Sequence, residues 1–260
     1  MKKLNPIPVV SAFSWLFPVK FLQKVSGINT IFPFYHTVSD RSLPHIKHLY
    51  HIKTTKEFKA DLDFLLKHFT PVEPGELLNK NIKRNDKPSF LLTFDDGLRE
   101  IKEIVAPILL DKGLKAIFFV NNDFIDNKDM LYRCKASLIV EEMKIKELSN
   151  ETSGEAATML GINRKDRRTL IRSVLGVDYK SRHILEEIGA LIGIDFAEFL
   201  EKERPYMSSE EIQELMEMGF YIGAHSSNHP QLGLLNEAEI LKEIRYSISD
   251  LKTRFNIDYR

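Results

Sequence analysis

The sequence predicts an α/β fold in which β/α units surround a mainly parallel sheet. Short apolar runs rich in β-branched and aromatic residues alternate with longer segments of helical periodicity. Capping patterns open several of these helices, and glycines close them just before a strand. Such transitions from helix to glycine to strand are what a (β/α) barrel requires.

Four apolar runs are expected to form the strands. Each lies between turn or polar residues and lacks strict alternation, which is typical of strands buried on both faces. The runs are TIFPFYH at 30–36, SFLLTF at 89–94, AIFFVN at 116–121 and FYIGAH at 220–225.

Helices are expected between and after these strands. They cover residues 54–69, 98–113, 208–219 and about 236–255. The second should bend at Pro107 and end at Gly113, because proline cannot continue the helical hydrogen bonds and glycine accepts the left-handed conformation. The last two each open with a capping box, in which a serine or asparagine is followed three residues later by glutamate.

Residues 126–206 interrupt this alternation of strands and helices. They contain helical segments at 136–148 and 182–193 but no convincing strand. Because the interval is too long for one crossover helix, we expect a helical insertion at about 126–206 within a domain spanning 30–260. Residues 1–29 form a separate N-terminal apolar or amphipathic segment.

Charge and cysteine content restrict the function classes. Lys plus Arg and Asp plus Glu are both 37, so no global field favours nucleic acid. The single cysteine, Cys134, excludes a disulfide framework and a thiolate metal cluster, and it fits a reducing compartment.

The N-terminal segment carries two lysines before an apolar stretch, as signal peptides do. Pro6, Pro8 and Pro18 interrupt the stretch, and no small-residue cleavage site follows cleanly. No run reaches the roughly 18 apolar residues of a membrane span. An amphipathic segment packed on the domain is favoured, with contact to a membrane surface and an uncleaved signal as alternatives. A cytoplasmic or peripheral membrane location is therefore expected, and export stays open.

Two adjacent carboxylates, Asp95 and Asp96, follow a strand and precede Gly97. A strand that ends there presents them at the carboxyl edge of the sheet, where α/β folds build their sites. Like charges repel, so a nearby cation would reduce the electrostatic repulsion between the two carboxylates. The alternative is an ordinary turn, because Asp-Gly is common after a strand.

A second pattern favours a metal site over that turn. His225 ends another expected strand and His229 follows four residues later. Two imidazoles in this spacing can converge on one ion, at about 2.0–2.1 Å for zinc. One aspartate with two histidines leaves open positions for water and substrate, so one carboxylate would be a ligand and the other a base.

TFDDG at 93–97 and HSSNHP at 225–230, with FYHTVSD upstream, resemble the polysaccharide deacetylases with a NodB homology domain, carbohydrate esterase family 4. The resemblance covers roughly residues 30–125 and 205–260. It implies a deformed (β/α) barrel, here incomplete at the C-terminus and carrying the helical insertion. It also implies a hydrolase of carbohydrate metabolism that removes N- or O-acetyl groups from a polysaccharide, acting on non-peptide carbon–nitrogen bonds.

The resemblance also implies residue roles. Asp95 would be the general base, and Asp96, His225 and His229 would bind a divalent metal, most often zinc. Ser226 would support the loop rather than bind metal. His36 stands where such proteins often carry a first-strand histidine, and it is either a substrate contact or a hydrogen-bonded core residue.

The sequence departs from the family after the histidine motif. The later motif with its oxyanion donor and the distal histidine that acts as general acid have no counterpart before Arg260. We expect either part of a longer deacetylase or a shortened homologue with impaired activity. The alternative is that a partner chain or a second copy closes the open barrel.

Three functions therefore follow from the sequence. The first is a metal-dependent deacetylase with an acetylated glycan as substrate. The second is a non-catalytic glycan-binding or assembly protein that keeps the scaffold. The third and weakest is another metallohydrolase, for which phosphate-ester hydrolysis would be the sign.

Overall fold

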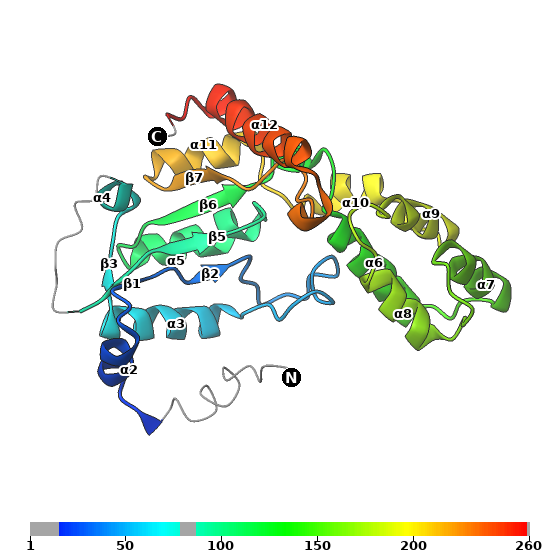
Figure 1. The fold of residues 1–260 in the computed structure, drawn as a ribbon, viewed down its shortest axis with the longest axis horizontal. Helices are drawn as coiled ribbons and strands as arrows, with labels where there is room; N and C mark the ends of the chain where they lie inside the picture. The colour runs from blue at the N-terminus through cyan, green and yellow to red at the C-terminus, as the bar shows by residue number, and fades with distance from the viewer. Residues whose placement is uncertain (1–15, 79–86, 259–260) are drawn as a thin grey trace.

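The computed structural model describes residues 16–78 and 87–258. Its ribbon shows a part built of parallel strands with flanking helices, and a group of helices, α6 to α10, that extends to one side (Figure 1). The structure is therefore mixed α/β, as the sequence predicts. Within the described residues the strands do not close into a barrel.

All strand pairings are parallel and form two short sheets. The first has the order β1-β4-β3 and the second β2-β5-β6-β7. The strands are β1 Thr30–Ile31, β2 Phe34–Tyr35, β3 Thr70–Pro71, β4 Ser89–Phe90, β5 Leu92–Phe94, β6 Ala116–Val120 and β7 Tyr221–Ala224.

Two of the expected strands are each split into two pieces. The run 30–36 becomes β1 and β2 around Phe32 and Pro33, and the run 89–94 becomes β4 and β5 around Leu91. The two split runs keep one register, with Thr30 opposite Ser89 and Tyr35 opposite Phe94. The two sheets are thus continuous along the chain, and β3, which the sequence analysis did not identify, pairs with β4.

Helices flank the sheets. They are α2 Val19–Ser26, α3 Thr55–His68, α4 Pro74–Leu78, α5 Ala106–Asp111, α11 Ser209–Glu217 and α12 Glu237–Phe255, with short 3-10 turns at Ile125–Asn127 and Leu232–Leu234. Both predicted capping boxes are present, from Ser208 with Glu211 and from Asn236 with Glu239. A third box, Thr54 with Glu57, opens α3.

The helix expected at 98–113 has two parts. Residues Ile101–Val105 form a wider π-helical turn, which continues directly into α5. Pro107 stands in the first turn of α5 and has no N–H to donate, so the change of hydrogen-bond pattern lies where the bend was expected. Gly113 then ends the segment with φ +64°.

Residues 121–220 contain helices and no strand, apart from one bridge between Leu98 and Tyr206. The helices are α6 Tyr132–Ile145, α7 Asn150–Met159, α8 Arg167–Leu175, α9 His183–Leu191 and α10 Phe196–Glu203. They share a hydrophobic cluster that includes Ile139, Val174 and Ile188, all fully buried. Their assignment as an insertion within one domain stays a prediction.

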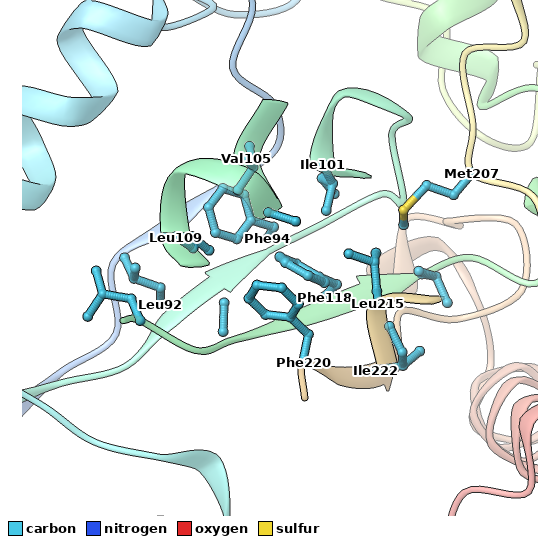
Figure 2. Close-up of a cluster of buried hydrophobic side chains, with 14 of the residues drawn as sticks. Leu92, Phe94, Ile101, Val105, Leu109, Phe118, Met207, Leu215, Phe220 and Ile222 are labelled. Atoms are coloured by element: carbon cyan, nitrogen blue, oxygen red, sulfur yellow. The ribbon is translucent and has the colours of Figure 1, made fainter. Parts of the chain in front are cut away.

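A second hydrophobic cluster holds the strands against their helices (Figure 2). Phe94 of β5 packs edge-on against Phe118 of β6 at 5.5 Å, and Phe118 packs against Phe220 at 5.0 Å. Val105 and Leu109 cover these rings from the helical side (Figure 2). This packing fixes the carboxyl ends of β5, β6 and β7 relative to one another.

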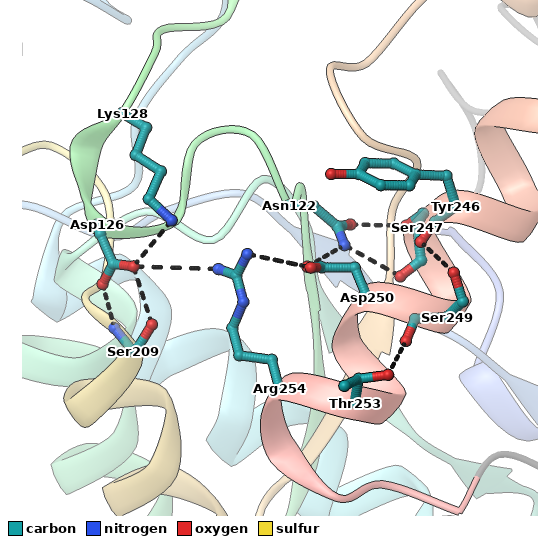
Figure 3. Close-up of polar contacts among 10 residues, drawn as sticks. All are labelled: Asn122, Asp126, Lys128, Ser209, Tyr246, Ser247, Ser249, Asp250, Thr253 and Arg254. Atoms are coloured by element: carbon teal, nitrogen blue, oxygen red, sulfur yellow. Dashed lines mark hydrogen bonds and ion pairs between the residues drawn. The ribbon is translucent and has the colours of Figure 1, made fainter.

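A polar network joins α12 to the end of β6 (Figure 3). The side-chain amide of buried Asn122 donates to Asp250 Oδ2 at 2.7 Å and to the Ser247 carbonyl at 3.1 Å, and it accepts from Ser247 Oγ at 2.9 Å. Arg254 connects Asp250 to Asp126 in the same network. The helix is therefore anchored to the segment that follows β6.

Candidate active site

The predicted acidic and histidine motifs meet at one edge of the four-stranded sheet. Asp95 and Asp96 follow β5, and His225 follows β7. Because the strands are parallel, their carboxyl ends lie at the same edge. Potential ligand atoms of Asp96, His225 and His229 all lie within 4.8 Å of one another.

The geometry of these three residues fits a shared cation. Asp96 Oδ1 lies 3.6 Å from Nε2 of His225 and 3.6 Å from Nε2 of His229. Ligands at about 2.05 Å around a tetrahedral ion stand about 3.4 Å apart, so these spacings are close to those of a zinc site. Asp96 is buried, and its Oδ1 accepts no hydrogen bond within the described residues. An acceptor left in this state is consistent with a missing positive partner.

Backbone conformation explains why a glycine follows the two aspartates. Asp96 and Gly97 both have positive φ, +72° and +66°. A Cβ atom on Gly97 would stand 3.2 Å from Cγ1 of Val120 on β6. The tight turn therefore needs glycine at this position, and it points the carboxylate of Asp96 toward the histidines.

The histidine loop is strained and internally hydrogen-bonded. Ser226 and His229 have φ of +62° and +56°, which costs energy for residues other than glycine. The His229 N–H donates to Ser226 Oγ at 3.2 Å, so Ser226 supports the loop as the resemblance implied. Asn121, at the end of β6, donates its side-chain amide to the carbonyl oxygens of His225 and Ser226.

Residues outside the motif also hold this loop. The Ser227 N–H donates to Glu243 of α12 at 3.1 Å. Between α8 and α9, the hydroxyl of Tyr179 donates to Asn228 Oδ1 at 2.6 Å, and its backbone N–H donates to Gln231 at 3.2 Å. Sequence reasoning missed Asn121, Tyr179 and Glu243, because no local pattern marks a contact between distant segments.

Burial governs the electrostatics of the site. It raises the pKa of Asp96 to about 6, although His36 opposes the rise, and it lowers the pKa of His225 to about 4. Burial also lowers the pKa of His229. The distances alone would allow ion pairs, but these directions favour neutral imidazoles, whose nitrogen lone pairs are free to bind a cation.

Asp95 has a different environment from its neighbour. It is half-buried, and its N–H donates to the Tyr35 carbonyl at 2.9 Å. Burial raises the pKa of its carboxyl, whereas electrostatic interactions with His36 and His229 oppose that rise. A half-exposed carboxylate beside the cation position is able to exchange protons with a bound molecule, and its role as base stays a prediction.

His36 lies at the site rather than in the core. Its Nε2 is 4.0 Å from Asp96 Oδ2, and its side chain is 28% exposed. Its ring packs against Tyr50 at 4.7 Å and against Phe34 at 5.9 Å. Phe34 is exposed, so one ring of this aromatic group is open to solvent.

Tyr206 and Phe124, two other aromatics near the motifs in sequence, belong to the core. They pack against each other at 5.1 Å and are both buried. The Tyr206 hydroxyl accepts the Leu131 N–H at 3.1 Å. Neither ring is available as a stacking platform for a sugar.

A cavity of about 380 Å³ lies between the histidine loop and the helices α6 and α9. Its lining includes Asn228 from the loop, Tyr132 and Lys135 from α6, and Arg182. The guanidinium of Arg182 stacks over the Tyr179 ring at 3.9 Å. The cavity thus combines aromatic and charged groups, and it meets the histidine loop at Asn228.

Comparison with known proteins agrees with this geometry. Residues 82–152 match the polysaccharide deacetylase family, a span that contains both aspartates. The resemblance to the polysaccharide deacetylases is confirmed. This match supports a polysaccharide deacetylase activity, that is, a hydrolase acting on carbon–nitrogen bonds. No curated protein matches the chain.

Solved structures share the deacetylase fold. IcaB from Ammonifex degensii is 17% identical, with a TM-score of 0.51 over 90% of this chain and 72% of that one. The de-N-acetylase from Aggregatibacter actinomycetemcomitans is 12% identical, with a TM-score of 0.51 over 89% and 77% of the two chains. At these identities the likeness concerns the fold alone.

Proposed function

We propose that this chain is a metal-dependent deacetylase that hydrolyses acetyl groups on the N- or O-acetylated sugars of a polysaccharide. The observation that carries the proposal is the position of buried Asp96 Oδ1, which has no hydrogen-bond partner among the described residues and lies 3.6 Å from two imidazole nitrogens. A second carboxylate, Asp95, stands directly beside this group. The family match over residues 82–152 supports the same reaction.

Asp96, His225 and His229 would hold the divalent ion, and their one-oxygen, two-nitrogen donor set suits zinc. When bound, such an ion supplies Lewis-acid polarisation of the acetyl carbonyl and of the attacking water. The neutral imidazoles favoured by burial are already in the protonation state that ligation requires.

Asp95 is assigned the proton transfer. Its carboxylate accepts a proton from the attacking water, while the water oxygen forms a bond to the acetyl carbon. The carbon–nitrogen bond then breaks, acetate is released, and the sugar nitrogen leaves as an amine after gaining one proton, which balances the proton that Asp95 accepted from water. In an O-acetylated sugar the same steps break the ester bond and release the sugar hydroxyl.

The cavity between the histidine loop and the α6–α9 region is assigned to the glycan. Its lining includes Asn228, which directly precedes His229, and the side chains of Lys135 and Arg182, which can donate hydrogen bonds to sugar hydroxyls. The helical region would then form one wall of the substrate cleft.

The test is acetate release from a panel of acetylated oligosaccharides, measured together with zinc content. Asp95→Asn should lower the rate by about 100-fold or more while zinc stays bound. His229→Ala should lose both zinc and activity. Asp111→Asn, an exposed aspartate at the end of α5, and His51→Ala, whose side chain is 76% exposed, are the matched controls.

Two results would contradict the proposal. Zinc binding and glycan binding without acetate release would support the non-catalytic glycan-binding alternative. Zinc content that His229→Ala leaves unchanged would mean that the ion binds elsewhere, and the assignment of the three ligands would be wrong.

A further inference from the structure

Helix α2 presents an apolar face that packs on no other part of the described chain. The helix has no buried residue, and Phe21 and Val25 are 49% and 71% exposed. Phe17, just before the helix, is 48% exposed and stacks on Phe21 at 5.3 Å. Phe21 and Val25 are four residues apart, so they lie on one side of the helix, and Phe17 is placed beside them by its stacking on Phe21.

The opposite side of α2 faces the protein. Val19 packs on the hydrophobic cluster of the sheet, and Leu22 and Gln23 are partly buried. The helix is therefore attached to the domain by one face, which leaves the aromatic face directed outward. Leu16 and Ile28, at the two ends of the helix, extend the outward apolar surface, with exposures of 55% and 51%.

Positive charge accompanies this apolar face. Lys20 and Lys24 lie three residues after Phe17 and Phe21, on the neighbouring stripe of the helix, and both are exposed. Neither forms an ion pair within residues 16–78 and 87–258.

The surrounding sequence has the same sign of charge. The chain contains no acidic residue before Asp40, although it contains Lys2, Lys3, Lys20 and Lys24 in that stretch. Lys2 and Lys3 lie outside the described residues, and only their charge enters the argument. The overall balance of 37 basic and 37 acidic residues makes this local excess distinctive.

From this combination we infer that the outward face of α2 docks on an anionic lipid bilayer surface. Aromatic and aliphatic side chains beside lysines are the pattern of a helix that lies in the membrane interface. The lysines would meet lipid phosphates and carboxylates, while Phe17, Phe21 and Val25 enter the headgroup boundary. A partner protein or a second copy would be expected to place acidic side chains opposite Lys20 and Lys24.

The inference is independent of the proposed chemistry, because α2 lies at the end of the α/β part away from the helices α6 to α10 (Figure 1). Among the described residues, no helix is long and apolar enough to cross a bilayer.

The test is co-sedimentation of the full chain with two kinds of vesicle, phosphatidylcholine alone and phosphatidylcholine mixed with phosphatidylserine. We expect binding to the mixed vesicles only, and weaker binding as salt increases. The double variant Lys20→Gln/Lys24→Gln should weaken binding by about tenfold or more. The triple variant Phe17→Ser/Phe21→Ser/Val25→Ser should abolish it.

Matched control variants on α3 test whether the loss of any exposed lysine or aromatic ring weakens vesicle binding. Lys56→Gln/Lys59→Gln removes two exposed lysines, and Phe64→Ser removes a ring that is 49% exposed. Both should leave vesicle binding unchanged. Because Lys20 and Lys24 are exposed, their variant keeps the test valid even if the triple variant fails to fold.

Three outcomes would overturn the inference. The first is absence of binding to mixed vesicles. The second is binding that both α2 variants leave unchanged. The third is a concentration-dependent increase in mass without lipid that both α2 variants abolish, which would assign this face to a second copy of the chain.

Discussion

The hydroxyl of Tyr179 donates a 2.6 Å hydrogen bond to Asn228 Oδ1, joining the α8–α9 loop to the histidine loop. Asn228 directly precedes His229 and also donates to Asp123 at 3.3 Å. His229 holds a positive φ that the chain does not favour by itself. Contacts from outside the loop therefore help to keep the imidazole of His229 opposite Asp96.

Removal of the Tyr179 hydroxyl should weaken metal binding. In Tyr179→Phe the ring stays in place while Asn228 Oδ1 loses its partner, so the loop samples other conformations. We expect zinc affinity to fall by about tenfold, as for other residues that orient ligands without touching the metal. Competition with a chromogenic chelator measures the affinity, and Tyr246→Phe, an exposed tyrosine on α12, is the control. Equal affinity in both variants would show that Tyr179 plays no part in positioning His229.

Substitution of Gly97 by alanine should destabilise the protein more than the same substitution at Gly113, a glycine with a similar backbone conformation. Gly97 and Gly113 have φ of +66° and +64°, but only Gly97 has a neighbour where a Cβ would stand, Val120 Cγ1 at 3.2 Å. Gly113→Ala should therefore cost roughly 1 kcal/mol of unfolding free energy from backbone strain alone. Gly97→Ala should cost about 2 kcal/mol or more, because it also displaces β6 or the turn.

Urea unfolding of the two glycine variants measures these costs. The Gly97→Ala protein should also bind zinc more weakly, since Asp96 belongs to the same turn. If the two variants are equally stable and bind zinc equally, the close approach of β6 does not constrain the acidic turn.

The network around Asn122 should contribute strongly to stability. Asn122 is 2% exposed and Ser247 is fully buried, and the two exchange hydrogen bonds between β6 and α12. Asn122→Ala leaves the Ser247 hydroxyl and carbonyl and one oxygen of Asp250 without this partner. We expect a loss of roughly 2–3 kcal/mol, because buried polar groups without partners are costly.

Thr253→Ala provides the control for Asn122, because the Thr253 hydroxyl donates to the Ser249 carbonyl within α12 at an exposed position. Its effect should stay within about 0.5 kcal/mol. Urea denaturation compares the two variants. A similarly small effect at Asn122 would mean that water replaces the lost hydrogen bonds.

Local patterns were sufficient to predict much of this structure. The capping residues Ser208 and Asn236 place the starts of α11 and α12, because a cap is satisfied within one turn of the chain. Asp96 and His225 follow strands, and parallel strands bring their ends together, so the meeting of the two motifs also follows from sequence.

Contacts between distant segments were beyond such reasoning. Tyr179 and Asn228 are 49 residues apart, and their hydrogen bond depends on how the α6–α10 region folds back on the sheet. The two-residue strand β3 has too little length for any periodic signal. The split of the first strand around Pro33 reflects the missing proline N–H, which sequence shows but whose effect depends on the neighbouring strand.

Buried His45 should make folding sensitive to mild acid. It is 4% exposed, neither ring nitrogen has a hydrogen-bond partner within the described residues, and its ring packs edge-on against Phe199 at 5.7 Å. Burial lowers the pKa of His45 to about 4, compared with about 6.5 in an unfolded chain. Between these values the unfolded state binds a proton that the folded state excludes, so stability falls as the pH falls through this window.

From pH 7 to pH 5 this one group should remove about 2 kcal/mol from the free energy of unfolding. His45→Phe keeps an aromatic ring against Phe199 and removes the titration. Urea unfolding of both proteins at the two pH values isolates the contribution, because every other titrating group is shared. The variant should lose about 2 kcal/mol less than the parent protein over this interval. Equal losses in the two proteins would mean that His45 takes up a proton in the folded state near its ordinary pKa, and that its buried nitrogens find a partner such as water.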